Sequence, residues 1–353
     1  MSTAIDRLPD PILIVGGYGY RNVGDEAILA GLLARLPARR VTVVSRDPAS
    51  TSALHGVPAI ALGGVVGALR RHRSIIIGGG GLFGRDMGAI GRLLPAFGLA
   101  ARALRRSVLI EGVDVDSVLS PTGRVLLPAL MRRAAHVSVR DRRSAELLRG
   151  WGVDAELAPD LSAWMPAAPV QDGSALLRSA GVDPRRPVVG LALNGVVPAR
   201  ADEAVAAAAS VMDAMPETQF VFLPMSRHPR VPAHDDLVIA RRLRDLRPEL
   251  LVVEAEASPP VMLAAFSQLG AVVAMRYHAM LFAERCGVPL VPLTYAEKTE
   301  RWLQERGREP VPARALELVA ALRDAIGRVE RIASPLPPPA RAIHGVASEL
   351  VIS

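Results

Sequence analysis

The chain has 353 residues, more than one ordinary core holds, so we expect two domains. Half of the residues are hydrophobic and 22% are charged, as in a soluble and well-packed protein, and the single cysteine, Cys286, excludes a disulfide framework within the chain and a cysteine-ligated metal site. The net charge of +7 favours anionic partners, but the aromatic residues, 4% of the chain, do not alternate with the arginines, so no nucleic-acid partner is expected.

The first half alternates short apolar, β-branched runs with longer helical patterns, which predicts a parallel sheet covered by helices. Each run is nearly continuous in apolar residues, as expected for strands buried on both faces. The predicted strands are Ile12–Gly16, Val41–Ser45, Ser74–Gly78, Val108–Glu111 and Val137–Arg140, with helices such as Asp25–Leu36 and Leu93–Leu104 between them.

The alternation breaks at Ala158–Val170, where three prolines indicate a connecting segment, and then restarts. The second set of predicted strands is Val188–Leu193, Phe220–Pro224, Leu251–Glu254, Ala271–Met275 and Leu290–Leu293. Helices are predicted near Ala201–Met215, Leu237–Leu246, Pro260–Leu269 and His278–Cys286.

Two successive α/β patterns predict two Rossmann-like domains that face each other across a cleft. We expect a first domain at residues 1–165, a linker at 166–186, a second domain at 187–330 and a tail at 331–353 that packs on the first domain. Ligands of such folds bind beyond the carboxyl ends of the strands, so site residues should directly follow strands.

The first predicted strand leads into a glycine-rich string, Gly16–Leu29, that opens a helix. Glycines allow a tight turn and a close approach of the backbone to a ligand, and a helix N-terminus attracts anions. The candidate ligand contacts in this string are Gly17, Gly19, Asn22 and Asp25. Asp25 is alternatively only the N-cap of the helix.

Two more first-domain strands end in candidate site residues. Four consecutive glycines follow Ile75–Ile77, and of these Gly79, Gly80 and Gly81 are expected in an exposed loop whose N–H groups face a substrate; the alternative is a flexible turn. Arg140 ends another strand, where it would clamp a carboxylate or phosphate with two parallel bonds, unless it forms a surface pair with Asp141.

The second domain supplies Arg276 and His278 where a predicted strand becomes a helix, and Lys298 just beyond the next strand. A histidine beside an arginine at a strand's carboxyl end is a candidate acid or base, although a lone histidine is more often structural. Lys298 is alternatively a solvated lysine. Because they follow neighbouring strands, the three should converge on a small, doubly anionic molecule.

These strings, in this order, resemble the polysaccharide pyruvyl transferase family from Gly16 to about Gly307. The resemblance implies phosphoenolpyruvate as donor, a two-domain fold like that of the GT-B glycosyltransferases, and no cofactor or metal. It further implies that Arg276 and Lys298 hold the donor, that Arg140 helps, and that His278 is the general acid. A family element of a proline followed by paired acids has a candidate in Pro224 with Asp235-Asp236, but the segment between them prevents a clear alignment.

The resemblance also implies a mechanism and an acceptor. His278, as imidazolium, would protonate the methylene carbon of the donor, and two sugar hydroxyls would form a cyclic ketal and release phosphate. Asp25 or Asp160 is a candidate for accepting the sugar proton. The first domain would hold the acceptor, a cell-surface glycan or its polyprenyl-diphosphate-linked precursor, and the second the donor.

The N-terminus lacks the features of a signal peptide and no run of about 18 apolar residues predicts a membrane span, so we expect a cytoplasmic protein. Arginines of the first domain are expected to attract anionic lipid at the inner membrane face. They are Arg70, Arg71, Arg73, Arg102, Arg105 and Arg106. The alternative is that they are solvated or paired with acids.

Two other functions remain open. A nucleotide-sugar-dependent glycosyltransferase of GT-B type would use the same glycine loops and cations for a diphosphate. A non-catalytic phosphosugar-binding protein is the second, although the set of Arg276, His278 and Lys298 argues against it. A dinucleotide oxidoreductase is disfavoured because the glycine string lacks the third glycine of that fingerprint.

Overall fold

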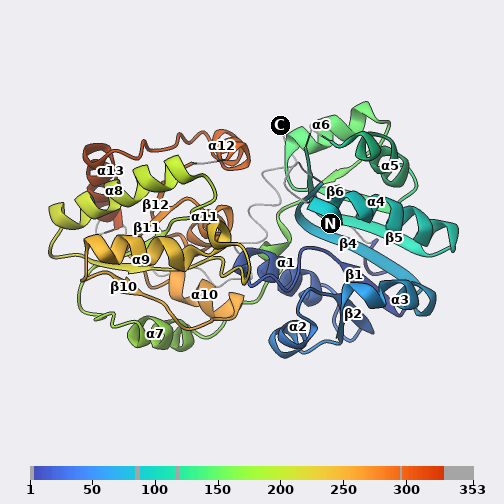
Figure 1. Ribbon diagram of the computed structural model, residues 1–353, viewed down its shortest axis with the longest axis horizontal. Helices are drawn as coiled ribbons and strands as arrows, with labels where there is room; N and C mark the ends of the chain where they lie inside the picture. Colours follow the sequence, from blue (N-terminus) through green and yellow to red (C-terminus); the bar gives the residue numbers. More distant parts are fainter. Residues whose placement is uncertain (1–3, 84–87, 117–118, 295, 330–353) are drawn as a thin grey trace. The chain divides into compact units, whose positions relative to one another are not determined.

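The computed structural model describes residues 4–83, 88–116, 119–294 and 296–329, so Tyr295 and the predicted tail at 331–353 lie outside the described chain. The chain divides into two compact units with the boundary between Pro166 and Ala167 (Figure 1). Arg21–Gly24 is an exception: this segment precedes the boundary in the sequence but belongs to the second unit. Within the described ranges no helix has the length and apolar character needed to cross a bilayer.

The first unit contains a seven-stranded parallel sheet in the order β3-β2-β1-β4-β5-β6-β7. Its strands are β1 (Ile12–Val15), β2 (Val41–Val44), β3 (Ala59–Ile60), β4 (Ser74–Phe83), β5 (Ser107–Val115), β6 (His136–Val139) and β7 (Glu156–Leu157). Both faces of β1 are buried because alternate residues enter different cores: Ile12 and Ile14 join one, Leu13 and Val15 the other. This explains the nearly continuous apolar runs of the sequence.

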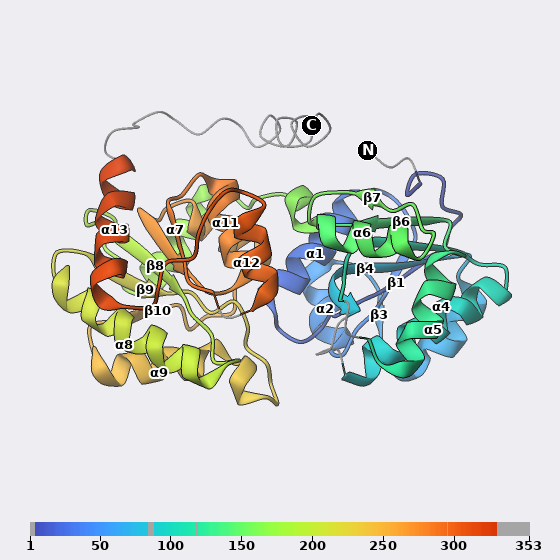
Figure 2. The same ribbon diagram turned by 90° about the horizontal axis from the view of Figure 1, so that it is seen from above.

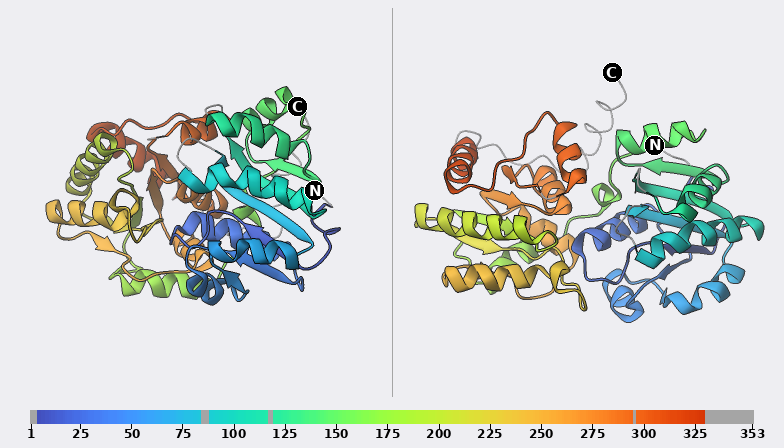
Figure 3. Two further views of the ribbon diagram at one scale, coloured as in Figure 1. Left: turned by 45° about the vertical axis from the view of Figure 1, so that its right-hand side comes forward. Right: turned by 45° about the horizontal axis from the view of Figure 1, so that its top comes forward.

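The helices of the first unit cover both faces of this sheet (Figure 3). They are α1 (Val23–Ala34), α2 (Pro48–His55), α3 (Val65–Arg71), α4 (Gly88–Ala103), α5 (Pro121–Met131) and α6 (Arg142–Gly150). Helix α1 packs on one face through Ile28 and Leu32, and α3 to α6 contribute to the core on the other. Helix α6 begins at Arg142 because the Asp141 carboxylate accepts the Ser144 N–H at 2.9 Å.

The second unit has a five-stranded parallel sheet in the order β10-β9-β8-β11-β12. The strands are β8 (Val188–Ala192), β9 (Gln219–Phe222), β10 (Leu251–Val252), β11 (Ala271–Ala274) and β12 (Leu290–Pro292). The helices are α7 (Val170–Ser179), α8 (Pro198–Ala214), α9 (Asp236–Leu246), α10 (Pro259–Phe266), α11 (Tyr277–Cys286), α12 (Glu297–Gln304) and α13 (Ala315–Val329). Residues of α8, α9 and α13 share one core with the sheet (Figure 2).

Two predicted features differ in the structure. The segment expected as a linker, residues 166–186, contains helix α7, whose Leu176 and Leu177 are buried and whose Gly173 packs on the backbone of α10. The glycine run is not a loop after a strand, because β4 continues through it to Phe83 beside β5. Both differences arise from packing partners that are distant in the sequence.

Candidate functional site

Arg276 and His278 lie at the start of helix α11, directly beyond strand β11. Arg276 is the N-cap residue and keeps an extended backbone, with φ −73° and ψ 129°, before the helix begins at Tyr277. The preceding Met275 is still tied to the sheet, because its N–H donates to the Ala192 carbonyl at 2.9 Å. The carboxyl edge of the second sheet therefore fixes both predicted site residues within one helical turn.

The Arg276 guanidinium is held by a buried carboxylate, Asp236, at the start of α9. Its Nε donates to both carboxylate oxygens at 3.1 Å, and Nη2 also donates to one of them. The Asp236 side chain is 0% exposed and that of Arg276 is 12% exposed. Burial raises the pKa of Asp236, and Arg276 together with the amides of Met225 and Ser226 acts in the opposite direction, so its ionised form depends on Arg276.

The segment Arg21–Gly24 of the glycine-rich string is built into the second unit. Its Val23 N–H donates to the Met225 carbonyl at 2.8 Å, and the Arg227 N–H donates to the Arg21 carbonyl at 3.0 Å. Asn22 and Ser226 face each other in this antiparallel contact. The same Met225 and Ser226 amides donate to Asp236 at 3.0 Å, so the segment and Arg276 share one anchor.

Gly24 lies against the His278 imidazole. A Cβ placed on Gly24 would lie 2.1 Å from His278 Nδ1 and 2.5 Å from its Cγ, so no side chain fits there unless the ring moves. On the helix side, the Tyr277 ring meets the imidazole edge-on at 5.4 Å between centroids. The His278 side chain is thus held between its neighbour on α11 and the start of α1.

Lys298 is exposed in the first turn of α12, and no ion pair forms between it and any other described residue. It lies four positions before Trp302, so the two share one face of the helix. Trp302 in turn packs against Tyr277, with ring centroids 6.3 Å apart. Helix α12 therefore contacts the start of α11 through Trp302, and the convergence of Lys298 with Arg276 and His278 stays a prediction.

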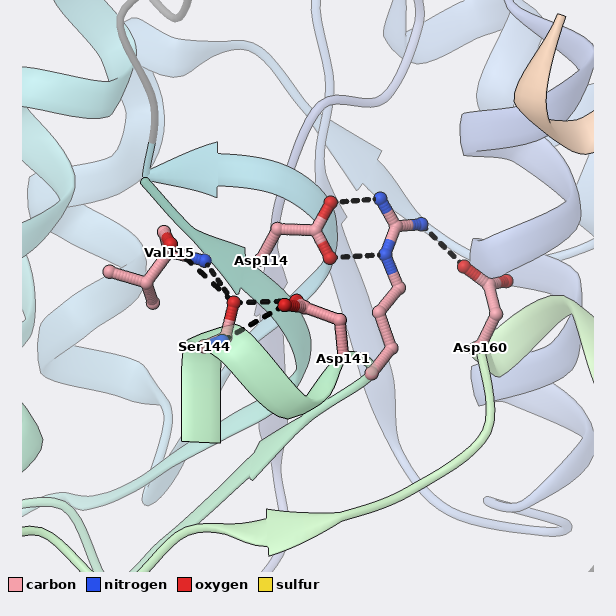
Figure 4. Close-up of polar contacts among 6 residues, drawn as sticks. Asp114, Val115, Asp141, Ser144 and Asp160 are labelled. Atoms are coloured by element: carbon pink, nitrogen blue, oxygen red, sulfur yellow. Dashed lines mark hydrogen bonds and ion pairs between the residues drawn. The ribbon is translucent and has the colours of Figure 1, made fainter. Parts of the chain in front are cut away.

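Arg140 occupies the carboxyl edge of the first sheet, where two carboxylates engage it. Its Nε donates to Asp114 at 2.5 Å with a parallel bond from Nη2, and Nη1 donates to Asp160 at 2.5 Å; Figure 4 draws these contacts. Asp141, the alternative partner expected from the sequence, caps α6 by accepting the Ser144 N–H at 2.9 Å. The formal charge of Arg140 with Asp114 and Asp160 is negative, so an anion would have to compete with carboxylates already in place.

Asp25 is not the N-cap of α1, because the helix begins at Val23 and the Asn22 side chain accepts the Gly24 N–H at 3.0 Å. Its carboxylate lies beside the glycine backbone: one oxygen is 3.8 Å from where a Cβ on Gly17 would lie, and the other is 3.7 Å from where a Cβ on Gly80 would lie. The predicted acceptor-side residue Asp25 and two of the predicted glycines therefore lie together.

The buried Glu26, which the sequence analysis did not single out, holds the glycine-rich turn. It accepts the Gly19 N–H at 2.8 Å and pairs with His55 Nε2 at 2.8 Å. Gly19 has a left-handed φ of +82°, and a Cβ there would lie 2.2 Å from Ser45 Oγ. Gly19 is thus required by the turn itself.

The run Gly79–Gly81 corrects the expected exposed loop. Gly79 and Gly80 are buried within β4 and have φ values of +83° and +80°, and only Gly81 is exposed. A Cβ on Gly79 would lie 1.9 Å from Ile28 Cγ2, so this glycine allows α1 to pack closely on the strand. Packing explains Gly79, while Gly81 has the exposure that a contact with substrate needs.

A separate hollow of about 270 Å³ opens on the second unit beside the ends of β11 and β12. Its lining includes Met275, Leu293 and Thr294 but neither Arg276 nor His278. Its one cation, Arg200, pairs with Glu203 at 3.0 Å, and Glu300 also lines it, so the hollow does not suit a small dianion.

Arg276, His278 and Lys298 were predicted from the sequence, but the residues that contact Arg276, His278 and Arg140 were not. Asp236 was noticed only as part of an acidic pair, and Gly24 only as a glycine of the opening string. Asp114 gave no local signal, because its contact with Arg140 joins the ends of two strands.

Comparisons with known proteins give a family and a fold. The profile of a family described as polysaccharide pyruvyl transferase matches residues 22–297. No curated protein sequence matches the chain.

Solved structures resemble the chain across most of its length. A UDP-GlcNAc 2-epimerase from Neisseria meningitidis, bound to UDP-GlcNAc, has a TM-score of 0.59 at 12% identity, covering 91% of this chain and 92% of that one. The UDP-GlcNAc 2-epimerase from Methanocaldococcus jannaschii has 0.61 at 11%, with 93% and 95% covered. ADP-heptose LPS heptosyltransferase II from E. coli has 0.52 at 13%, with 91% and 100% covered. At these identities the likeness shows the fold alone, which is the two-sheet GT-B architecture.

Proposed function

The chain belongs to the polysaccharide pyruvyl transferase family, and from this premise we propose that it transfers the pyruvyl group of phosphoenolpyruvate to a sugar as a cyclic ketal. The acceptor is a cell-surface glycan or its polyprenyl-diphosphate-linked precursor. The observation that carries the proposal is the joint placement of Arg276 and His278 at the start of α11. A fixed cation and a proton donor there match the two needs of this donor: an anion site and an acid.

The second unit is proposed to bind the donor. Phosphoenolpyruvate carries a carboxylate and a phosphate, and Arg276 and Lys298 supply side-chain cations for them. The N-terminus of α11 adds the positive end of a helix dipole. Arg140 has a helping role in this proposal, and a donor would reach it only in competition with Asp114 and Asp160.

The proposed reaction moves one proton at each end. The His278 imidazolium gives its proton to the methylene carbon, and a sugar hydroxyl attacks the neighbouring carbon, which carries the developing positive charge. A carboxylate takes the hydroxyl proton: either Asp25, which lies beside Gly17 and Gly80, or Asp160, which accepts from Arg140 and the Ser162 amide. The second hydroxyl then displaces phosphate and closes the ketal; its proton leaves with the phosphate as HPO4²⁻, and the proton held by the carboxylate returns through solvent to restore the His278 imidazolium. Side-chain cations neutralise the donor throughout, so no cofactor or metal enters this scheme.

The first unit is proposed to hold the acceptor. We also propose that the protein is cytoplasmic and that this unit contacts the anionic inner face of the membrane. Arg106 Nη2 donates to the Arg70 carbonyl at 3.0 Å, and Arg102 Nη1 to the Arg106 carbonyl at 2.8 Å, so these arginines cluster beside the amino ends of β4 and β5. Among the residues that the structure describes, none of the six predicted arginines pairs with an acid. Leu104 and Val66 are exposed nearby, 49% and 65%, which favours a lipid surface over nucleic acid.

The test is an assay of purified protein with phosphoenolpyruvate and candidate lipid-linked sugars, with the pyruvylated product detected by mass spectrometry. A thermal-shift comparison separates the rival activity: phosphoenolpyruvate should stabilise the protein and UDP- or ADP-sugars should not. Stabilisation by a nucleotide sugar alone would favour a glycosyltransferase of the same fold. Binding of phosphosugars without turnover would favour the non-catalytic alternative.

A further inference from the structure

Asp236, whose side chain is 0% exposed, is a completely buried carboxylate beside the proposed donor site, and polar groups hold it. It accepts N–H groups from Met225 and Ser226 at 3.0 Å and from Arg276 Nε at 3.1 Å. Its neighbour Asp235 already performs the helix-capping task, because the Asp235 carboxylate accepts the Leu237 N–H at 3.1 Å. The start of α9 therefore does not need a second acid.

Burying this carboxylate is costly, and stability alone does not account for it. A buried ion pair is often no more stabilising than apolar residues of similar volume, because both charges lose their water. What the pair supplies is geometry: two oxygens accept from two guanidinium nitrogens and fix the plane of the Arg276 fork. The two backbone amides fix Asp236 in turn.

We infer that Asp236 is a positioning residue that orients Arg276 for the donor anion and anchors the Met225–Arg227 segment, which holds Arg21–Gly24. This rests on the proposed function for the identity of the anion. Asp236 acts through Arg276 and has no contact with substrate. Its charge also leaves Arg276 locally neutral, so net positive charge for the donor comes from Lys298 and from protonated His278.

The rival explanation reverses the roles. Arg276 would be a structural counter-ion that only neutralises Asp236, and the donor, if any, would bind elsewhere. Both explanations predict that the pair matters for folding. They differ in whether loss of Asp236 changes an anion site.

The first experiment needs no substrate. Phenylglyoxal modification of Arg276, followed by peptide mass spectrometry, is compared in the wild type, Asp236→Asn and the matched control Asp235→Asn. We expect modification of Arg276 to be at least about tenfold faster in Asp236→Asn and unchanged in Asp235→Asn, because a guanidinium held in an ion pair is shielded. An unchanged rate in Asp236→Asn would overturn the inference. If Asp236→Asn does not fold, Asp236→Ser takes its place, because serine does not point an NH2 group at the Met225 and Ser226 amides.

The second experiment tests the link to the donor. Asp236→Asn is expected to raise the KM for phosphoenolpyruvate about tenfold or more, with the acceptor KM unchanged, and Asp235→Asn to change neither. In a double-mutant cycle with Arg276→Ala, the two effects on donor affinity should be strongly non-additive, since one residue acts through the other. Additive effects would contradict the positioning role.

The two experiments also separate this inference from the proposed function. A wild type that shows neither binding nor turnover of phosphoenolpyruvate, together with faster labelling of Arg276 in Asp236→Asn, refutes the donor assignment and leaves the positioning of Arg276 standing. Normal donor turnover with unchanged labelling refutes only the role of Asp236.

Discussion

The His278 ring packs directly against the Cα of Gly24. A Cβ at this position would lie only 2.1 Å from His278 Nδ1, so a larger residue would clash with the ring. Two motifs from opposite ends of the sequence meet at this contact. The last glycine of the opening string, Gly24, therefore positions the proposed general acid.

Gly24→Ala should displace the imidazole and lower both stability and turnover. We expect about 1–3 kcal/mol of destabilisation, as for overpacking of a dense site. In a His278→Ala background the ring is gone, and the same substitution should be neutral or stabilising by up to about 1 kcal/mol, because Ala is the better helix former. Urea unfolding of the four proteins in this cycle measures the difference. Gly150→Ala, where nothing lies within 4 Å of the added methyl, is the control and should not destabilise.

His278→Ala or His278→Gln should reduce turnover about a hundredfold or more while donor affinity stays nearly unchanged, as for loss of a general acid. Steady-state kinetics with titration calorimetry separates the two quantities. Near-normal turnover in a folded variant would remove His278 from the acid role.

Arg276→Ala should destabilise the protein more at high pH than at low pH. Without Arg276, only the Met225 and Ser226 amides oppose the effect of burial, so the pKa of Asp236 rises further and the folded state binds a proton that the unfolded state releases above about pH 4. Stability then falls as pH rises toward the folded pKa, by at most about 1.4 kcal/mol per pH unit. Thermal unfolding of wild type and variant from pH 5 to pH 8 should show a widening gap in Tm. The double variant with Asp236→Asn should lose this pH dependence, and a gap that stays constant in Arg276→Ala would contradict the prediction.

Cys286 should be a slow thiol. Burial raises its pKa to about 11, against a smaller lowering effect of Arg285, and the Sγ–H donates to the Leu263 carbonyl at 3.5 Å. A higher pKa leaves less thiolate at a given pH, so at pH 8 we expect reaction with Ellman's reagent about a hundredfold slower than for a free thiol. The rate should rise with pH up to about pH 11, and in urea it should equal that of a free thiol. Fast reaction of the folded protein at pH 8 would show that the thiol is more accessible than the structure indicates.

The arginine cluster of the first unit should bind anionic vesicles weakly and reversibly with salt. Each basic residue near the surface contributes about 1 kcal/mol, and physiological salt screens contacts beyond about 8 Å. Replacing Arg71, Arg73 and Arg105 by Gln should abolish co-sedimentation at low salt. Matched Gln replacements of Arg242, Arg244 and Arg247, which are ion-paired in the second unit, should not. Equal pelleting of the two triple variants, or none of the wild type, would remove the membrane contact.

Local sequence patterns were sufficient to predict the two parallel sheets and the strand ends at which the candidate site residues lie. Apolar runs of four or five residues are sufficient to predict buried parallel strands, since both faces of such strands are covered. Arg276 and His278 were found because they directly follow one of these runs. The family profile matches residues 22–297, a range that contains both of them.

The partners of the charged residues, and the unit to which Arg21–Gly24 of the opening string belongs, could be seen only in the folded chain. Arg140 meets Asp114 and Asp160, and Arg276 meets Asp236, across separations that leave no periodic signal in the sequence. The glycine run became part of a strand because Ile28 of α1 packs against Gly79. Local patterns report backbone preference and burial, which depend on near neighbours, whereas ion pairs and close packing depend on which strand ends and helix starts the completed fold brings together.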